Sequence, residues 1–225
     1  LPGVKVGRQW RFPADRVYEQ FGLAARADES DTSAVVDTSD TLLARLLRPE
    51  VAQSVADLIG QTFGVMAVVT EMDGRAITTV ANPCGYYAAV AGQPGAAAAC
   101  LAEWRLFASE PHVAPRFVPT HLGFLCARTF VWVDLKPVGM IVVGGVRPTL
   151  WPPAGERIEA IADEFGVPRH VLLDSVDQTW NLDAAEQRRI LQLLPQMGDL
   201  VSHLATARRQ VLDAHHELDT PQGGE

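Results

Sequence analysis

Long apolar runs are missing from this 225-residue sequence. No stretch approaches the roughly 18 consecutive apolar residues of a membrane-spanning helix, and no basic segment leads into an apolar one as in a secretory signal. The sequence therefore predicts a cytoplasmic chain with no membrane partner. Because 48% of the residues are apolar and 20% are charged, we expect an ordinary globular protein with one substantial core. The first residue is not methionine, so we expect the chain to begin part-way through a longer protein.

Cysteine is also scarce. The three cysteines, Cys84, Cys100 and Cys126, are an odd number at wide spacing. This excludes the disulfide framework of a small secreted domain and leaves reduced thiols or metal ligands. No pair has the short C-x-x-C or H-x-x-x-H spacing that marks a metal site strongly.

Catalytic motifs are absent as well. The sequence has no G-x-S-x-G, no phosphate-binding G-x-x-x-x-G-K-[ST] and no H-E-x-x-H. The adjacent glycines of "VVGGV" at 142–146 are not followed by the spacing of a dinucleotide-binding turn. We therefore expect no enzyme and assign no catalytic residue.

Charge is distributed unevenly along the chain. The formal net charge is −8, yet residues 1–16 contain four cations against Asp15. A basic head on an acidic body suggests contact with an anion such as a nucleic acid backbone, while the alternative is an ordinary solvated surface.

The head also has a pattern. In "LPGVKVGRQWRFPADRVYEQF" apolar and polar residues alternate on both sides of a Gly-Arg turn, and Pro13 can begin a helix. This segment resembles the wing and closing helix at the end of excisionase-like and MerR-like winged helix-turn-helix domains. The resemblance implies that residues 1–23 are the incomplete end of a DNA-binding domain, whose recognition helix would precede Leu1. Lys5, Arg8 and Arg11 would contact phosphates. Residues 24–40 have the composition of a linker.

The remaining chain predicts an α+β domain. Helical periodicity starts near Leu42, with Pro49 bending or dividing the helix, and "GVMAVVTEMDGRAITTV" predicts a hairpin turning at Asp73-Gly74. We expect a helix at 96–109, strands at 125–133 and 138–146, and helices at 154–165 and 168–175. The order predicts a PAS-like or GAF-like antiparallel sheet covered on one face by helices.

Four longer motifs in this domain resemble one particular family. "LIGQTFGVMAVVTEMDGRAITTVANPCGYY", "GQPGAAAACLAEW", "THLGF" and "LKPVGMIVVGGV" together resemble the PocR-type sensory domain, here over about 42–204, with the domain proper at 41–180. The resemblance implies a module that senses a small hydrocarbon derivative, such as an alcohol or diol, and controls a linked DNA-binding domain. Cys84, Cys100, His121 and Gly123 match family positions, whereas Thr120 replaces a third family cysteine and Cys126 falls near a position that is usually Asp.

These departures leave two interpretations of the cysteines. Cys84, Cys100, His121 and Cys126 could bind zinc or iron or form a redox switch. Alternatively, Cys100 is a buried apolar thiol on an alanine-rich helix, and no cofactor is expected.

A sensing pocket needs an apolar cavity with a few convergent polar groups. On the 125–133 strand, alternation places Cys126, Arg128, Phe130 and Trp132 on one face and Ala127, Thr129, Val131 and Val133 on the other. We expect the pocket between the sheet and residues 82–104, with His121 at its rim, although each candidate could also be structural. The candidate ligand-binding residues are Asn82, Tyr86, Tyr87, Trp104, His121, Arg128 and Phe130.

The C-terminal segment 181–214 predicts a helix with a heptad stripe, followed by a flexible tail at 215–225. The stripe consists of Ile190, Leu194, Met197, Val201, Leu204 and Val211, and Pro195 is expected to kink the helix. A homodimeric coiled coil and packing on the helix's own domain both explain this pattern.

The sequence thus predicts a cytoplasmic, homodimeric transcription regulator that senses a small organic effector. A metal or redox switch is the alternative. A dimerisation scaffold without ligand would leave the mixed polar and aromatic strand face unexplained.

Overall fold

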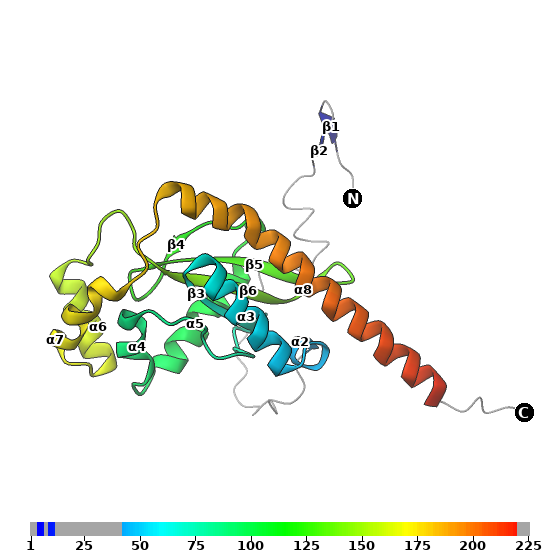
Figure 1. Ribbon diagram of the computed structural model, residues 1–225, viewed down its shortest axis with the longest axis horizontal. Coiled ribbons are helices and arrows are strands. Elements are labelled where there is room, and N and C mark those ends of the chain that lie inside the picture. Colours follow the sequence, from blue (N-terminus) through cyan, green and yellow to red (C-terminus); the bar gives the residue numbers. More distant parts are fainter. Residues whose placement is uncertain (1–3, 7–8, 12–41, 220–225) are drawn as a thin grey trace, which may run out of the picture.

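The computed structural model describes residues 4–6, 9–11 and 42–219 (Figure 1), with side chains placed for 42–215. Strands β1 (Val4–Val6) and β2 (Gln9–Arg11) pair antiparallel with Val4 opposite Arg11, as the alternation predicts. The expected closing helix and linker lie outside the described residues.

The main sheet has four antiparallel strands in the order β3-β6-β5-β4. They are β3 (Met66–Glu71), β4 (Val118–Pro119), β5 (Leu125–Val133) and β6 (Lys136–Val146). The bounds of β5 agree with the prediction. Strand β6 begins two residues early because Asp134 and Leu135, both at positive φ, form a two-residue hairpin turn.

Helices make up most of the rest of the described chain. Before the last strands come α2 (Leu42–Leu46), α3 (Pro49–Phe63), α4 (Gly85–Ala91) and α5 (Ala96–Ser109); after them come α6 (Gly155–Phe165), α7 (Arg169–Ser175), the 3-10 turn Val176–Gln178 and α8 (Ala184–Asp219). Pro49 divides α2 from α3 by starting the second helix, where its missing N–H is tolerated. The α+β class, the antiparallel sheet and the long C-terminal helix are as predicted, and α4 was not foreseen.

The sheet is covered on both faces, so the expectation of one covered face was wrong. One face packs against α2, α3 and α8 through residues such as Ile59, Ile141 and Leu194. The other face packs against α4 to α7 through residues such as Met140, Phe107 and Ile161. The strand sequences agree with burial on both faces, because β3 and the centre of β6 are apolar almost continuously rather than alternating between apolar and polar residues.

The predicted hairpin at 64–80 forms only in part. The chain turns at Asp73-Gly74, but afterwards it makes only the isolated bridges Thr70 to Ala76 and Ala67 to Ala81. The Thr78 hydroxyl accepts the hydrogen bond of the Val69 amide at 3.1 Å, in place of a backbone carbonyl. A side chain therefore replaces one hydrogen bond of the regular strand pair.

Helix α8 packs along β5 and then runs past the sheet (Figure 1). Ile190, Leu194 and Val201 of the predicted seam are buried in the core of this same chain. They are therefore not available for a partner, and packing on the helix's own domain explains this half of the pattern. Leu204 and Val211 remain exposed.

Candidate functional site

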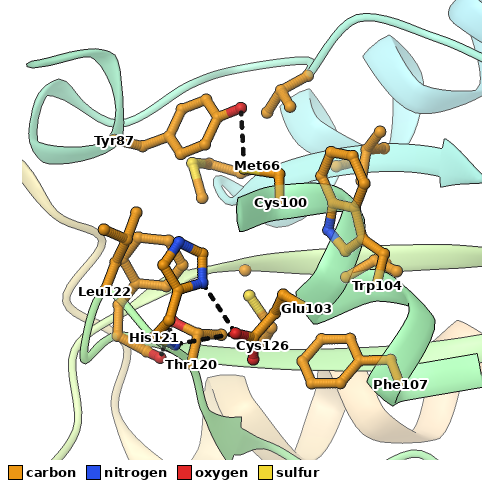
Figure 2. A pocket seen from close by; sticks show the side chains of 16 residues that line it. Met66, Tyr87, Cys100, Glu103, Trp104, Phe107, Thr120, His121, Leu122 and Cys126 are labelled. Atoms are coloured by element: carbon orange, nitrogen blue, oxygen red, sulfur yellow. Dashed lines mark hydrogen bonds and ion pairs between the residues drawn. The ribbon is translucent and has the colours of Figure 1, made fainter. Parts of the chain in front are cut away.

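A pocket lies between the sheet, α5 and the loop that precedes β5 (Figure 2). Its cavity volume is about 40 Å³, well below the roughly 300–1,000 Å³ of sites for drug-sized ligands, so it has room for a molecule of a few heavy atoms. Its walls are mostly apolar. The lining residues are Met66, Ala67, Val68, Val80, Tyr87, Cys100, Glu103, Trp104, Phe107, Thr120, His121, Leu122, Phe124, Cys126, Val142 and Gly144.

Three of the seven predicted ligand-binding residues, Tyr87, Trp104 and His121, line this pocket. They come from α4, α5 and the loop before β5, so the fold brings together segments that are distant in sequence. Of the predicted metal ligands, Cys100 and Cys126 line the pocket as well. The cavity lies between the sheet and the 82–104 segment, and its role as a sensing pocket stays a prediction.

Helix α5 supplies one wall because of its periodicity. Cys100, Glu103, Trp104 and Phe107 are spaced three, four and seven residues from the first, and this places them on one helix face. Glu103 was not predicted as a site residue. The sequence does mark this residue, because Glu103 is a carboxylate within a helical stripe of otherwise apolar residues.

His121 and Glu103 are linked at the rim of the pocket. Glu103 Oε2 accepts hydrogen bonds from His121 Nδ1 at 2.8 Å and from the His121 backbone N–H at 3.0 Å (Figure 2). The side chains are only 22% and 14% exposed. The His121 ring lies 6.0 Å from that of Phe165, and its carbonyl accepts a hydrogen bond from Arg157.

The other ring nitrogen of His121 is unusual. Nε2 is buried and has no hydrogen-bond partner among the residues with described side chains. A carboxylate can only accept at Nδ1, so Nδ1 carries a proton, and in the neutral imidazole Nε2 is then an acceptor. A buried polar atom without a partner costs free energy, and Nε2 is left unsatisfied among these residues.

The "THLGF" loop places His121 through a tight turn. The Thr120 amide donates to the Phe124 carbonyl and the Gly123 amide to the Thr120 carbonyl, both at 2.9 Å. Gly123 has φ 87°, a conformation that a side chain rarely allows. The glycine of this motif is therefore needed for the turn that presents His121 to the pocket.

Tyr87 and Cys100 close another side of the pocket. The Tyr87 hydroxyl lies 4.0 Å from Cys100 Sγ. Burial, followed by the neighbouring thiol, raises the pKa of Tyr87 well above its usual value, and burial raises that of Cys100. Both groups are therefore neutral at pH 7.

The other predicted ligand residues have structural partners outside this pocket. Asn82, at φ 47°, donates from Nδ2 to the carbonyls of Gly60 at 3.3 Å and Val65 at 3.1 Å, and so joins the end of α3 to β3. Tyr86 is fully buried and packs edge-on against Trp151 at 5.3 Å.

Arg128 and Phe130 also lie away from the pocket. Arg128 is 5% exposed and donates from Nε to the Phe107 carbonyl at 2.5 Å and from a terminal nitrogen to the Glu110 carbonyl at 2.8 Å. Its guanidinium lies 4.1 Å above the centre of the Phe130 ring. Arg128 thus joins the end of α5 to β5, and strand alternation alone could not separate this role from ligand contact.

The three cysteines are free and buried. Within residues 42–215 no group of three or more His, Cys, Asp and Glu side chains could hold a metal ion, so Cys84, Cys100, His121 and Cys126 are not gathered into one ligand set. Burial raises the pKa of all three thiols. The Cys126 side chain packs so closely against Gly144 that a Cβ at position 144 would have no room.

The side chains of the predicted DNA-binding residues, Lys5, Arg8 and Arg11, lie outside the described ones. In the described part of the chain, no helix has the length and apolar character needed to cross a membrane.

The fold defines a small α+β domain of the PAS-like or GAF-like class, with a mostly apolar pocket beside its sheet. The chain belongs to the family described as the sensory domain found in PocR, whose profile matches residues 45–206. The match extends into α8, in agreement with the packing of that helix on the sheet. No curated protein and no solved structure matches the chain.

Proposed function

We propose that the chain is the sensory part of a cytoplasmic transcription regulator, in which a small organic molecule occupies the pocket between α5 and the sheet. The ligand is an uncharged compound with a short carbon skeleton and a hydroxyl group, such as an alcohol or diol. Binding controls a linked DNA-binding domain, and the regulator is a homodimer. The pocket binds its ligand without chemical change.

The buried Nε2 of His121 carries this proposal. It is an acceptor without a partner among the described side chains, and its ring is held in place by Glu103. A ligand hydroxyl would donate to it and remove the free-energy cost of the unpaired nitrogen. Membership of a sensory family supports binding rather than catalysis at this position.

The walls support the same class of ligand. Met66, Trp104 and Phe107 give the pocket apolar surface, and the Tyr87 and Cys100 groups beside them are neutral. A carboxylate ligand would meet the carboxylate of Glu103 at the rim and would be repelled. An alcohol or diol would bury its carbon atoms and keep one polar group at His121.

Thermal shift of the purified chain against short alcohols, diols, ketones and carboxylic acids tests the ligand class. The compound with the largest stabilisation is then titrated by calorimetry into the wild type, His121→Ala and His170→Ala. His170 is exposed on α7 and is the matched control.

We expect His121→Ala to weaken binding by about fivefold or more, since a buried hydrogen bond contributes about 1 kcal/mol. His170→Ala should bind like the wild type. Equal affinity of all three proteins, or stabilisation by carboxylic acids alone, would contradict the proposal.

A further inference from the structure

Helix α8 carries two apolar stripes, and its own domain buries one of them almost completely. Ile190, Leu194, Val201 and Ala205 are 3% exposed or less and pack into the core beside β5. Gly198 lies in the same line and lets the helix approach the strand closely, because a Cβ there would lie 2.8 Å from the Phe130 carbonyl oxygen.

The residues of the second stripe stand one position before those of the first stripe. Because an α-helix turns by about 100° per residue, the second stripe is displaced by about 100° around the helix. Its residues follow one another at intervals of four, three, four, three and four. Leu193 is half-buried, and Met197 is half-buried because it packs partly against the core of its own domain, whereas Leu200, Leu204 and Val211 are 52%, 43% and 45% exposed. The stripe consists of Leu193, Met197, Leu200, Leu204, Ala207 and Val211.

We propose that this second stripe binds the same stripe of a second copy of the chain in a two-stranded coiled coil. The proposal names the interface of the homodimer and therefore rests on that part of the proposed function. It does not depend on the ligand or on the pocket.

The spacing favours an identical partner. Apolar residues that alternate at three and four form the seam of a coiled coil, and two copies of one stripe are complementary by symmetry. Leu200 and Leu204 lie at its centre. The stripe covers 18 steps along the helix, about 27 Å at 1.5 Å per residue.

The charges beside the stripe also permit two copies to meet. The flanking positions that face a partner in a coiled coil are Gln196, His203, Arg208 and Gln210 on the exposed part of the helix. None of them is acidic, although the chain as a whole has a net charge of −8. Two copies can therefore approach along this face without carboxylates opposite each other.

The C-terminal end of α8 also favours a partner helix. Arg209 forms an ion pair with Asp134 at the β5–β6 turn, and the helix then continues to Asp219 beyond the sheet (Figure 1). These last ten residues extend about 15 Å, and an isolated helix of that length is marginal in water. Packing against a second α8 would stabilise this segment.

Sedimentation equilibrium of the full 225-residue chain between about 1 and 100 μM tests the interface. The test variants are Leu200→Asp combined with Leu204→Asp, and separately Val211→Asp, which lies beyond the contacts with the domain. The control combines Leu135→Asp with Leu212→Asp, two exposed apolar residues outside the stripe. Circular dichroism melting verifies that each protein is folded.

We expect a wild-type dimer and an unchanged control. The dissociation constant of the double variant should rise at least about a hundredfold, since two apolar contacts at the centre of the interface are replaced by carboxylates in each copy. Val211→Asp should weaken the dimer less. A monomeric wild type, or a test variant that dimerises like the control, would overturn the proposal.

The same proteins separate this inference from the sensing function. A variant that is monomeric but still stabilised by the effector in thermal shift supports the interface and leaves the pocket intact. Absence of an effector response in the wild type and in every variant, while the wild type is a dimer and the double variant is not, would count against the proposed ligand and not against the stripe.

Discussion

Two hydrogen bonds join Glu103 to His121: Glu103 Oε2 accepts one from the His121 ring at Nδ1, at 2.8 Å, and one from the His121 backbone N–H, at 3.0 Å. This pair ties α5 to the turn before β5. It fixes the orientation of the imidazole, and with it the position of the unpartnered Nε2.

Glu103→Ala should therefore loosen both the ring and the turn. We expect the free energy of unfolding to fall by about 1–3 kcal/mol, because hydrogen bonds to a charged, mostly buried group are lost. Urea unfolding at pH 7 measures this change. Glu159→Ala is the control, since Glu159 and its partner Arg169 are each 55% exposed, and it should shift stability by less than about 0.5 kcal/mol. Equal effects of the two variants would show that the Glu103 pair is an ordinary surface contact.

The basic head should contribute affinity for DNA without sequence preference. Replacing Lys5, Arg8 and Arg11 by Ala in the intact protein should weaken binding about equally for different DNA sequences, because contacts to phosphates do not read bases. The dependence of the binding constant on salt concentration should also become flatter. A control that replaces three exposed cations of the sensory domain, Arg48, Lys136 and Arg188, should retain the wild-type slope. An unchanged slope in the head variant would argue against the wing assignment.

The three thiols should react slowly in the folded protein. Each is buried, and burial raises the pKa of each, so little thiolate is present at pH 7. We expect modification by a thiol-reactive disulfide to be at least about a hundredfold slower in native than in urea-unfolded protein. A Leu135→Cys variant, which adds a thiol at a 75% exposed position, should react at once at that single site. Fast reaction of the native wild type, or stoichiometric zinc or iron in the purified chain, would revive the metal or redox alternative.

Local sequence patterns were sufficient to predict much of the fold. Strand β5 and helix α5 begin and end at the residues that alternation and helical periodicity indicate. The covered second face was missed because an antiparallel sheet usually has one solvated face, while the apolar continuity of β3 and β6 reports burial on both.

The site was less accessible to sequence reasoning. Tyr86 and Tyr87 are adjacent, yet one lies in the core beside Trp151 and the other lines the pocket, since consecutive residues of α4 point about 100° apart. Only the packing of α4 on its neighbours decides which tyrosine faces the cavity. For α8, the sequence showed a heptad but could not show that the domain itself occupies part of it.

Gly198 offers a test of how α8 is held on the sheet. Ala normally favours a helix over Gly by about 1 kcal/mol, but a Cβ at this position would lie 2.8 Å from the Phe130 carbonyl oxygen and 2.9 Å from Thr129 Cγ2. We expect Gly198→Ala to destabilise the domain by about 1–3 kcal/mol, since the helix must move away from β5. Gly92→Ala has open space around its Cβ and should be neutral or slightly stabilising in the same urea unfolding experiment. If Gly198→Ala is as stable as Gly92→Ala, the close approach does not limit the packing of α8.

The hydroxyl of Tyr86 provides the last test, because it is buried and has no hydrogen-bond partner among the described side chains. Tyr86→Phe removes an unpaired polar group and keeps the edge-on ring contact with Trp151, so stability at pH 7 should be unchanged or increased.

The pH dependence of the same variant gives a second observable. Burial raises the pKa of Tyr86 from about 10 to about 12, so between these values the folded state keeps a proton that the unfolded state has lost. The folded state then binds more protons than the unfolded state, and the free energy of unfolding must fall as pH rises from 10 to 12. In Tyr86→Phe this part of the decline should disappear, while in Tyr18→Phe, a tyrosine outside the sensory domain, it should remain. Urea unfolding at pH 7, 10, 11 and 12 measures both effects, and a wild-type slope in Tyr86→Phe would mean that other groups control alkaline unfolding.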